Sequence, residues 1–410
     1  MKLTVSLSNQ ELKKLDIVNR LIRKQINGTQ AAQLLDLSVR QVKRLKVKVL
    51  ILGQKSVAHA SRGKIGHNRL ADEERELIKS LLKEHYSDFG PTLATEKLFE
   101  IHQIKRNVKT IKEIMIEENL WTPRRKRKGI VPQHRSWRLR RANYGELIQF
   151  DGSYEYWFEG RWFEGRAEKC CLLAAIDDAT GKVVYACFDK DEGVFPVFSF
   201  WYEYLLKMGK PTSIYLDKFS TYKMTQQVAI NNHDLKTQFQ RAMSDLCIEP
   251  IFANSPQAKG RVEKLFHTLQ DRLIKELRLK NISDMKTANE FLVTEFLPNF
   301  NDRFGVLPRN STNLHKSLTE KEKKRLPSIF SRQTKRIIQN DFTISFNNQW
   351  YQLLEKQPVT ICKRDEVIVE ERLDGQVYFC LRNKYLNAKP ITKNREYANR
   401  KKQPWILVAG

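Results

Sequence analysis

Apolar residues recur at two different spacings along the chain, and the change in spacing divides it into parts. Residues 12–50 and 68–121 follow the helical period, whereas the chain from residue 145 onward alternates short β-branched runs with helical segments. This pattern predicts a multidomain α+β protein. The predicted parts are two helical modules (1–60 and 68–121), a linker (122–144), an α/β core with a mixed five-stranded sheet (145–305), a helical connector (306–334), a small β-barrel (335–389) and a tail (390–410).

The first module has the pattern of a helix-turn-helix unit. Thr29 can cap a helix at 30–35, and Ser38 can cap a second helix at 39–49. If the aliphatic residues of the second helix pack inward, its polar residues face the major groove or the flanking phosphates of DNA. An ordinary helical hairpin with a solvated basic face is the alternative. The inward residues are Val39, Val42 and Leu45, and the predicted DNA contacts are Arg40, Gln41, Lys43 and Arg44.

The second module repeats this pattern with less charge bias. Its helices are predicted at 72–85, 91–101 and 108–119, with a break at Gly90. Acidic and basic residues nearly balance here, so a simple packing module competes with a second helix-turn-helix unit. In the DNA-binding alternative the phosphate contacts are Lys105, Arg106, Lys109 and Lys112.

The net charge favours a nucleic-acid partner. The chain carries 73 Lys and Arg against 47 Asp and Glu, a formal net charge of +26. Residues 1–145 hold 32 of the basic and 14 of the acidic residues, so 18 of the 26 net charges lie in about a third of the chain. A ribosomal-type basic protein is the alternative that charge alone leaves open.

The predicted linker concentrates this charge further. Residues 123–141 contain nine Lys and Arg with little hydrophobic periodicity, so the segment cannot fold alone. Next to a catalytic core, such a segment is suited to lie along the DNA backbone and neutralise phosphates. A solvated interdomain linker is the alternative. The predicted phosphate contacts are Arg124, Arg125, Lys126, Arg127 and Lys128.

No signal peptide and no apolar run long enough to span a bilayer is recognised in the sequence, so we expect a cytoplasmic protein without a membrane partner. The six cysteines show no paired CxxC spacing. A disulfide framework or a zinc finger is therefore not expected, and the cysteines are interpreted as reduced core residues.

The carboxy-terminal part is rich in strand-like runs with Asn-Asn and Asp-Gly turns. We predict a small β-barrel that contacts DNA or another subunit, with a stabilising cap as the alternative. The predicted strands are 341–346, 350–353, 358–361, 366–369 and 377–381.

The middle of the chain has the element order of a ribonuclease-H-like fold. In that fold the first strand lies at the centre of a mixed sheet, with the strand that carries the second carboxylate beside it. Asp151 is placed at the end of the first predicted strand and Asp217 at the end of a later one. The predicted elements are a strand to 153, a hairpin at 170–188 with its turn at 178–181, a helix at 194–207, a strand at 211–217, a helix at 237–246 and a strand at 248–252.

Three acidic residues of this core, Asp151, Asp217 and Glu263, are candidate metal ligands. Hard divalent ions require carboxylate oxygens held by rigid elements, and these acids come from two strands and a helix. Glu263 alone resembles a solvent-facing charge, but three acids in these elements favour a two-metal site for phosphoryl transfer. Lys259, Arg261 and Lys264 surround Glu263 and are predicted to contact DNA.

Other acids near these positions have simpler interpretations. Asp177 and Asp178 lie at the hairpin turn, where Asp is favoured for turn hydrogen bonds. Asp177 is the one serious competitor for a metal ligand. Asp189, Asp191 and Glu192 are interpreted as an ordinary helix cap.

Four segments of the core resemble one known family. Residues 149–153, 175–181, 255–263 and 268–273 are similar to the integrase-type catalytic core of bacterial DDE insertion-sequence transposases, especially the ISNCY group. The likeness covers about 145–304, and the block from Ser255 to Glu263 is long and specific. The chain has Glu155 where the family leads us to expect a histidine. It also lacks the zinc-binding His and Cys pairs of retroviral integrases, which favours the transposase branch.

The resemblance implies a retroviral-integrase-like, ribonuclease-H-like core in which Asp151, Asp217 and Glu263 form the DDE triad. It further implies two Mg²⁺ ions per active site, with Mn²⁺ as a substitute. The implied partners are double-stranded DNA, as terminal inverted repeats and target, and a second copy of the chain in at least a dimer. The implied reaction is 3′-end cleavage and strand transfer in the bacterial nucleoid. A sequence-specific endonuclease without strand transfer and a non-catalytic DNA-binding regulator are the alternatives.

Overall fold

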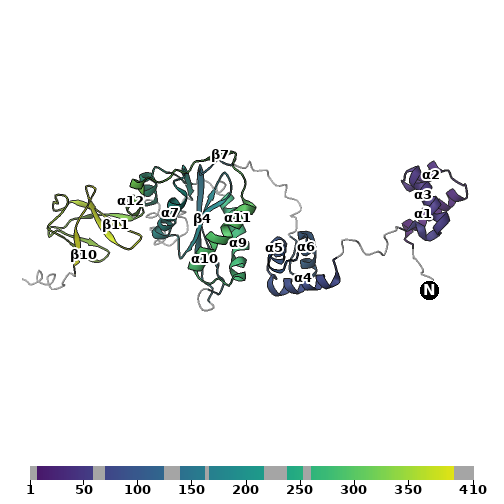
Figure 1. Ribbon diagram of the computed structural model, residues 1–410, viewed down its shortest axis with the longest axis horizontal. Coiled ribbons are helices and arrows are strands. Elements are labelled where there is room, and N and C mark those ends of the chain that lie inside the picture. Colours follow the sequence, from purple (N-terminus) through teal and green to yellow (C-terminus); the bar gives the residue numbers. More distant parts are fainter. Residues whose placement is uncertain are drawn as a thin grey trace, which may run out of the picture. The chain divides into compact units, whose positions relative to one another are not determined.

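The computed structural model of this chain describes residues 7–58, 70–123, 139–161, 166–216, 238–252 and 260–391. The chain divides into two compact units, Met1–Pro123 and Arg124–Gly410. Figure 1 shows helices in the first unit, and in the second a sheet with flanking helices followed in sequence by further strands. None of the helices in the described part of the chain has the length and apolar character that a membrane span requires.

Each α-helix of the first helical module begins with a capping box, which satisfies backbone N–H groups that lack partners within the helix. The second helix begins at residue 28, earlier than predicted, because the side chain of Asn27, and not that of Thr29, accepts the Gln30 N–H at 2.8 Å. Ser38 caps the third helix as predicted. The helices are α1 (Asn9–Ile22), α2 (Gly28–Leu35) and α3 (Val39–Leu52), followed by the short η1 (Gln54–Val57).

The packing of α3 differs from the prediction at one position. Val42 is fully buried and Leu45 is half-buried, as expected, but Val39 is 38% exposed. The prediction that Val39 packs inward is wrong, because it is the first residue of α3 and no preceding turn of helix covers it.

The second helical module contains α4 (Asp72–His85), α5 (Pro91–His102) and α6 (Val108–Glu117), close to the predicted ranges. Its core is made of aliphatic residues such as Ile78 and Ile111, both fully buried. Ion pairs join Glu74 to Arg106 and Arg75 to Glu117.

The second unit is built on a five-stranded mixed sheet of order β4-β3-β2-β5-β6. Strand β2 is central, antiparallel to β3 and parallel to β5, and β5 is parallel to β6. The predicted central first strand and its predicted neighbour are therefore confirmed. The strands are β2 (Leu147–Glu155), β3 (Cys170–Asp177), β4 (Val183–Asp189), β5 (Ser213–Leu216) and β6 (Glu249–Phe252).

Helices cover both faces of this sheet, because the alternate residues of its strands are apolar on both sides. In β3, Cys171 and Leu173 pack with α7 (Val194–Met208), whereas Leu172 and Ala174 pack with α9 (Gly260–Leu279). Figure 1 shows α7 on one side of β4 and α9 and its successors on the other. The successors are α10 (Met285–Phe291), the π-helical η3 (Leu292–Phe296) and α11 (Leu297–Phe304), and residues 238–245 form a helix on the α7 side.

A short parallel pairing and a helix connect the core to the carboxy-terminal strands. Strand β1 (Asn143–Tyr144) pairs with β7 (Asn310–Asn313), and α12 (Glu320–Ile329) packs its buried Leu326 and Ile329 into the α7-side core. The helix predicted in the connector is confirmed.

The carboxy-terminal strands form two sheets around a shared core, and no closed barrel is found among the described residues. One sheet has the order β14-β10-β9 and the other β13-β12-β11-β8. The predicted closed β-barrel is therefore unconfirmed. The strands are β8 (Arg332–Ile337), β9 (Thr343–Phe346), β10 (Gln349–Leu353), β11 (Glu366–Glu371), β12 (Val377–Leu381), β13 (Lys384–Tyr385) and β14 (Ala388–Ile391).

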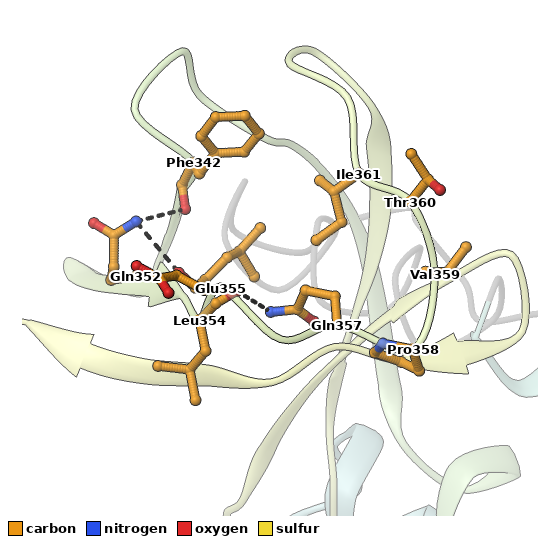
Figure 2. Close-up of a pocket in the computed structure, with 10 residues that line it drawn as sticks. Phe342, Gln352, Leu354, Glu355, Gln357, Pro358, Val359, Thr360 and Ile361 are labelled. Atoms are coloured by element: carbon orange, nitrogen blue, oxygen red, sulfur yellow. Dashed lines mark hydrogen bonds between the residues drawn. The ribbon is translucent and has the colours of Figure 1, made fainter.

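One predicted strand of this part is a loop. Residues 358–361 form no strand, because Pro358 has no N–H to donate to a ladder and the Thr360 carbonyl accepts from the Arg382 guanidinium at 3.0 Å. The loop lines a pocket of about 780 Å³ together with Phe342 and Leu354, which Figure 2 shows at the end of β10.

All six cysteines are free. Cys170 and Cys171 are buried as expected, but Cys247 and Cys362 are exposed, so the expectation that every cysteine lies in the core is wrong.

Candidate active site

Asp151 lies in the middle of the central strand and on the face covered by α9. The strand was predicted to reach Ser153 with Asp151 near its end, and β2 continues to Glu155 because residues 152–155 pair with β3 in register. Side chains alternate along a strand, and Phe150 packs on the α7 side. Asp151 therefore shares the opposite face with Gln149 and Ser153.

Glu263 lies in the first turn of α9, and its side chain is exposed. An acidic residue there interacts favourably with the helix dipole. The flanking Val262 is fully buried against the sheet, as predicted for the inward stripe of this helix.

Two contacts show that α9 runs along β2. Near its start, the Arg261 guanidinium binds the carboxylate of Asp178, which also accepts from Gln149 of β2. Further along, Gln270 Nε2 donates to Ser153 Oγ at 3.1 Å. Nine helical residues rise about 14 Å and four strand residues about 13 Å, so the two contacts match in spacing. Helix α9 therefore carries Glu263 across the face of β2 that bears Asp151.

Asp217 lies outside the described residues, and its place in the site stays a prediction. Strand β5 is described to Leu216, and Gln149 of β2 pairs with Tyr215 of β5. Each member of this pair precedes a predicted metal ligand by two residues.

The described donors suit a hard divalent ion in their chemistry. Asp151 and Glu263 supply carboxylate oxygens from a strand and a helix that are packed on one another, as oxygen-ligated ions require. Among the described residues alone, no group of three His, Cys, Asp or Glu side chains is close enough to hold a metal. The third predicted ligand belongs to the part that is not described.

Asp177 has the turn role that the sequence predicted. Its Oδ2 accepts from the Thr180 N–H at 2.8 Å and the Thr180 hydroxyl at 2.7 Å, and its Oδ1 accepts from the Gly145 N–H at 2.9 Å. Burial raises the pKa of this carboxyl, and the hydrogen bonds oppose that shift. Asp177 is thus engaged within its own turn and with Gly145, in the turn between β1 and β2.

Asp178 has partners that the sequence did not suggest. Its side chain is fully buried, and it accepts from Gln149 Nε2 at 2.6 Å and from the Arg141 N–H at 2.9 Å. Its third partner is Arg261, which the sequence placed among the DNA contacts. The DNA contact of Arg261 stays a prediction, but its guanidinium also has this partner inside the protein. The sequence feature that could have indicated this role of Arg261 is its position two residues before Glu263.

Gly152 adjoins Asp151 and is closely packed on its α7-side face. A Cβ built on Gly152 would lie 2.8 Å from Glu192 Oε2 and 2.9 Å from Cys171 Sγ. The sequence interpreted Glu192 as an ordinary cap residue, and its position over β2 was missed. Glu155, where a histidine was expected, accepts the Tyr156 N–H at 3.0 Å.

The predicted DNA contacts fall into three groups. Three further predicted contacts have partners inside the protein, and their DNA contacts stay predictions. Gln41 Oε1 accepts the Ser38 N–H at 3.0 Å, Arg106 pairs with Glu74, and the Lys112 ammonium lies 4.9 Å from the centre of the Trp121 ring. The exposed group, whose DNA contacts stay predictions, is Arg40, Lys43, Arg44, Lys105, Lys109 and Lys264. Lys259 and the linker residues Arg124, Arg125, Lys126, Arg127 and Lys128 lie outside the described residues.

Comparison with known proteins identifies the class. No family model matches the chain. The chain is 38% identical over 356 residues to a protein of Sinorhizobium fredii described as the putative transposase y4bF, which covers 87% of this chain and 75% of that protein. It is 27% identical over 423 residues to the transposase for insertion sequence IS1202 of Streptococcus pneumoniae, covering 95% and 88% of the two chains. The chain belongs to this family of transposases.

The solved structures that match the chain are more distant in sequence. The catalytic core domain of HTLV-2 integrase in complex with magnesium is 18% identical, with 37% of this chain and 85% of that chain covered and a TM-score of 0.26. A chain of the simian T-cell lymphotropic virus intasome is 16% identical over 78% of this chain and all of that chain, with a TM-score of 0.32.

Proposed function

We propose that this transposase is a DDE enzyme that cuts the 3′ ends of an insertion sequence and joins them to target DNA. The observation that supports the proposal most is the placement of Asp151 on the central strand beneath α9, the helix that carries Glu263. Membership of a transposase family makes DNA ends the natural substrate.

In this proposal Asp151, Asp217 and Glu263 hold two Mg²⁺ ions, which Mn²⁺ can replace. When bound, the ions neutralise developing charge on the phosphodiester and activate the attacking water or 3′-hydroxyl. The protein contributes position: β2 and α9 hold two of the carboxylates on rigid elements. Lys264, exposed on α9 beside Glu263, and Lys259 are suited to hold a phosphate of the bound DNA.

The first helical module would recognise the terminal inverted repeats. Helix α3 presents Arg40, Lys43 and Arg44 as exposed side chains beyond a capped turn, which is the residue chemistry of a recognition helix. The second helical module and the basic linker would add phosphate contacts. Because two ends must be held together for joining, we propose that the active form is at least a dimer.

The test uses the full chain and the DNA that flanks its gene, where the element ends should lie as inverted repeats. Asp151→Asn and Glu263→Gln are expected to abolish Mg²⁺-dependent 3′ cleavage while end binding is retained. Glu203→Gln makes the same chemical change on α7, away from the proposed site, and should cleave like the wild type. Cleavage by either site variant at the wild-type rate would contradict the triad.

Two further results separate the alternatives. Joining of a precut 3′-hydroxyl end to plasmid DNA supports a transposase over an endonuclease. Binding of the ends without cleavage in Mg²⁺ or Mn²⁺ would favour a non-catalytic regulator.

A further inference from the structure

A single buried carboxylate connects three separate parts of the catalytic core. Asp178 accepts hydrogen bonds from partners that lie 37, 29 and 83 residues away in the sequence, namely Arg141, Gln149 and Arg261. Gln149 and Arg261 donate to the same oxygen, Oδ1, and the Arg141 N–H donates to Oδ2. The carboxylate is fully buried, and the Arg261 side chain is 20% exposed.

The hairpin turn does not account for this arrangement. The hydrogen bonds that close the turn are accepted by Asp177, through the N–H and hydroxyl of Thr180. Stability does not account for it either, since a buried ion pair loses in desolvation much of what it gains in attraction, and apolar residues of similar volume often serve as well. What the carboxylate does provide is a defined distance between the elements that bind it.

Those elements carry the two described ligands of the proposed site. Gln149 is two residues before Asp151 on one face of β2, a separation of about 7 Å along a strand. Arg261 is two residues before Glu263, a rise of about 3 Å along a helix. The backbone therefore fixes the distance from Gln149 to Asp151 and from Arg261 to Glu263. Gln149 and Arg261 in turn bind the same oxygen atom, Oδ1 of Asp178.

The contact of Arg261 with Asp178 holds α9 at the end where the helix is weakest. Glu263 lies in the first turn, where N–H groups lack partners within the helix and the end frays. A further polar contact between α9 and β2, that of Gln270 with Ser153, lies nearly two turns beyond Glu263. The contact with Asp178 therefore adds a polar tie between the first turn of α9 and β2 to the packing of the buried Val262.

We propose that Asp178, acting through Arg261 and Gln149, is a positioning residue that sets the spacing between Asp151 and Glu263. The inference rests on the proposed function, because it concerns the same two carboxylates. It assigns Arg261 a role inside the protein in addition to any contact with DNA.

The test compares Asp178→Asn and Arg261→Gln with a matched control in the full chain. The control is Arg278→Gln, which breaks the pair of Arg278 with Glu159 (2.6 Å) near the other end of α9. Amide hydrogen exchange is measured on peptides covering 260–266 and 272–279. Both test variants should speed exchange in the first peptide, whereas the control should affect only the second.

The functional readout is the Mg²⁺ concentration for half-maximal end cleavage. It should rise by about 10-fold or more in Asp178→Asn and Arg261→Gln, since residues that orient metal ligands typically change affinity by 10–100-fold. Arg261→Lys, which keeps the charge, should recover part of the loss, and Arg278→Gln should match the wild type. If Asp178→Asn fails to fold, as judged by circular dichroism, the two Arg261 variants decide the result.

Two outcomes would overturn the proposal. Unchanged exchange in 260–266 would mean that Asp178 does not order the start of α9. Faster exchange with an unchanged metal requirement would mean that it holds the helix without positioning the ligands. If the wild-type protein cleaves no DNA end, the proposed function fails by itself. In that case two measurements on the free protein still decide the role of Asp178. They are amide hydrogen exchange and Mn²⁺ binding, the latter monitored by electron paramagnetic resonance.

Discussion

Arg261, at the start of α9, forms an ion pair with Asp178, whose carboxylate is fully buried in the turn between β3 and β4. The pair joins a helix to a hairpin 83 residues earlier in the chain. Because Arg261 is two residues before Glu263, this contact fixes the start of α9 to the hairpin, next to the candidate active site.

Removal of this carboxylate should destabilise the core strongly. Asp178→Ala leaves the Arg261 guanidinium and the Gln149 amide without their shared acceptor, and breaking a buried pair in this way costs about 3–5 kcal/mol. The measurement is urea unfolding of the full chain, monitored by tryptophan fluorescence. The buried Trp157 and Trp201 of the core contribute to this signal.

An exposed pair provides the comparison. Glu203→Ala breaks the contact of Glu203 with Lys207, in which both side chains are more than 40% exposed, and should cost less than about 1 kcal/mol. Equal losses of unfolding free energy in Asp178→Ala and Glu203→Ala would show that burial of Asp178 adds nothing to the cost of breaking its contacts.

A methyl group beside Asp151 should disturb the central strand. Gly152→Ala places its Cβ under 3.0 Å from both Glu192 Oε2 and Cys171 Sγ, and overpacking of this kind costs about 1–3 kcal/mol. We expect a lower unfolding midpoint and slower end cleavage. Gly28→Ala, whose Cβ would meet only Val39 Cγ1 at 3.8 Å, should show neither effect.

Stability should depend on pH through His315. Desolvation lowers the pKa of this imidazole to about 4 from its usual 6.5. Its Nδ1 lies 2.9 Å from Asn313 Oδ1, which only accepts, so Nδ1 donates and Nε2 accepts from the Tyr204 hydroxyl at 2.7 Å. The neutral ring is thus the form that fits the folded protein.

The sign of the effect follows from proton uptake. Between pH 6.5 and 4 the unfolded chain binds a proton at His315 that the folded chain does not, so stability is lost as pH falls through this window. The thermal midpoint of the wild type should fall more steeply over that range than that of His315→Gln. Parallel curves for the two proteins would contradict the assignment.

DNA binding by α3 should be visible in its salt dependence. Lys43 is exposed on α3, and Lys43→Ala should remove one phosphate contact. The variant should bind the element ends more weakly, and its slope of log affinity against log salt should be smaller by about 1. Lys14→Ala removes the same charge from an exposed position on α1. If both variants change the slope equally, net charge and not a contact by α3 is responsible.

Much of the fold could be predicted from local patterns, because the period of apolar residues and the caps act within a few residues. The range 72–85 of α4 and the range 170–177 of β3 agree with the predicted helix and strand. The strand order followed from the sequence of elements. The candidate acids were chosen from the sequence too, because Asp151 and Asp217 follow apolar strand-like runs and Glu263 belongs to a specific sequence block, but their metal ligation stays a prediction.

Local patterns failed where contacts between distant segments decide the structure. β2 runs two residues past the predicted strand end at Ser153, because Tyr154 and Glu155 pair with Cys171 and Cys170 of β3. Residues 358–361 look like a strand but form a loop, in which the Thr360 carbonyl accepts from Arg382, 22 residues away in the sequence.

The sequence by itself indicated the class of this protein through its resemblance to a known family. It also predicted the elements of the core and the candidate acids, which depend on residue type and short-range spacing. Only the tertiary structure decided the partners of those residues. The pairing of Asp178 with Arg261 and of Ser153 with Gln270 spans 83 and 117 residues. No local pattern records such a contact, because chain topology brings the two segments together only after the sheet and α9 have packed.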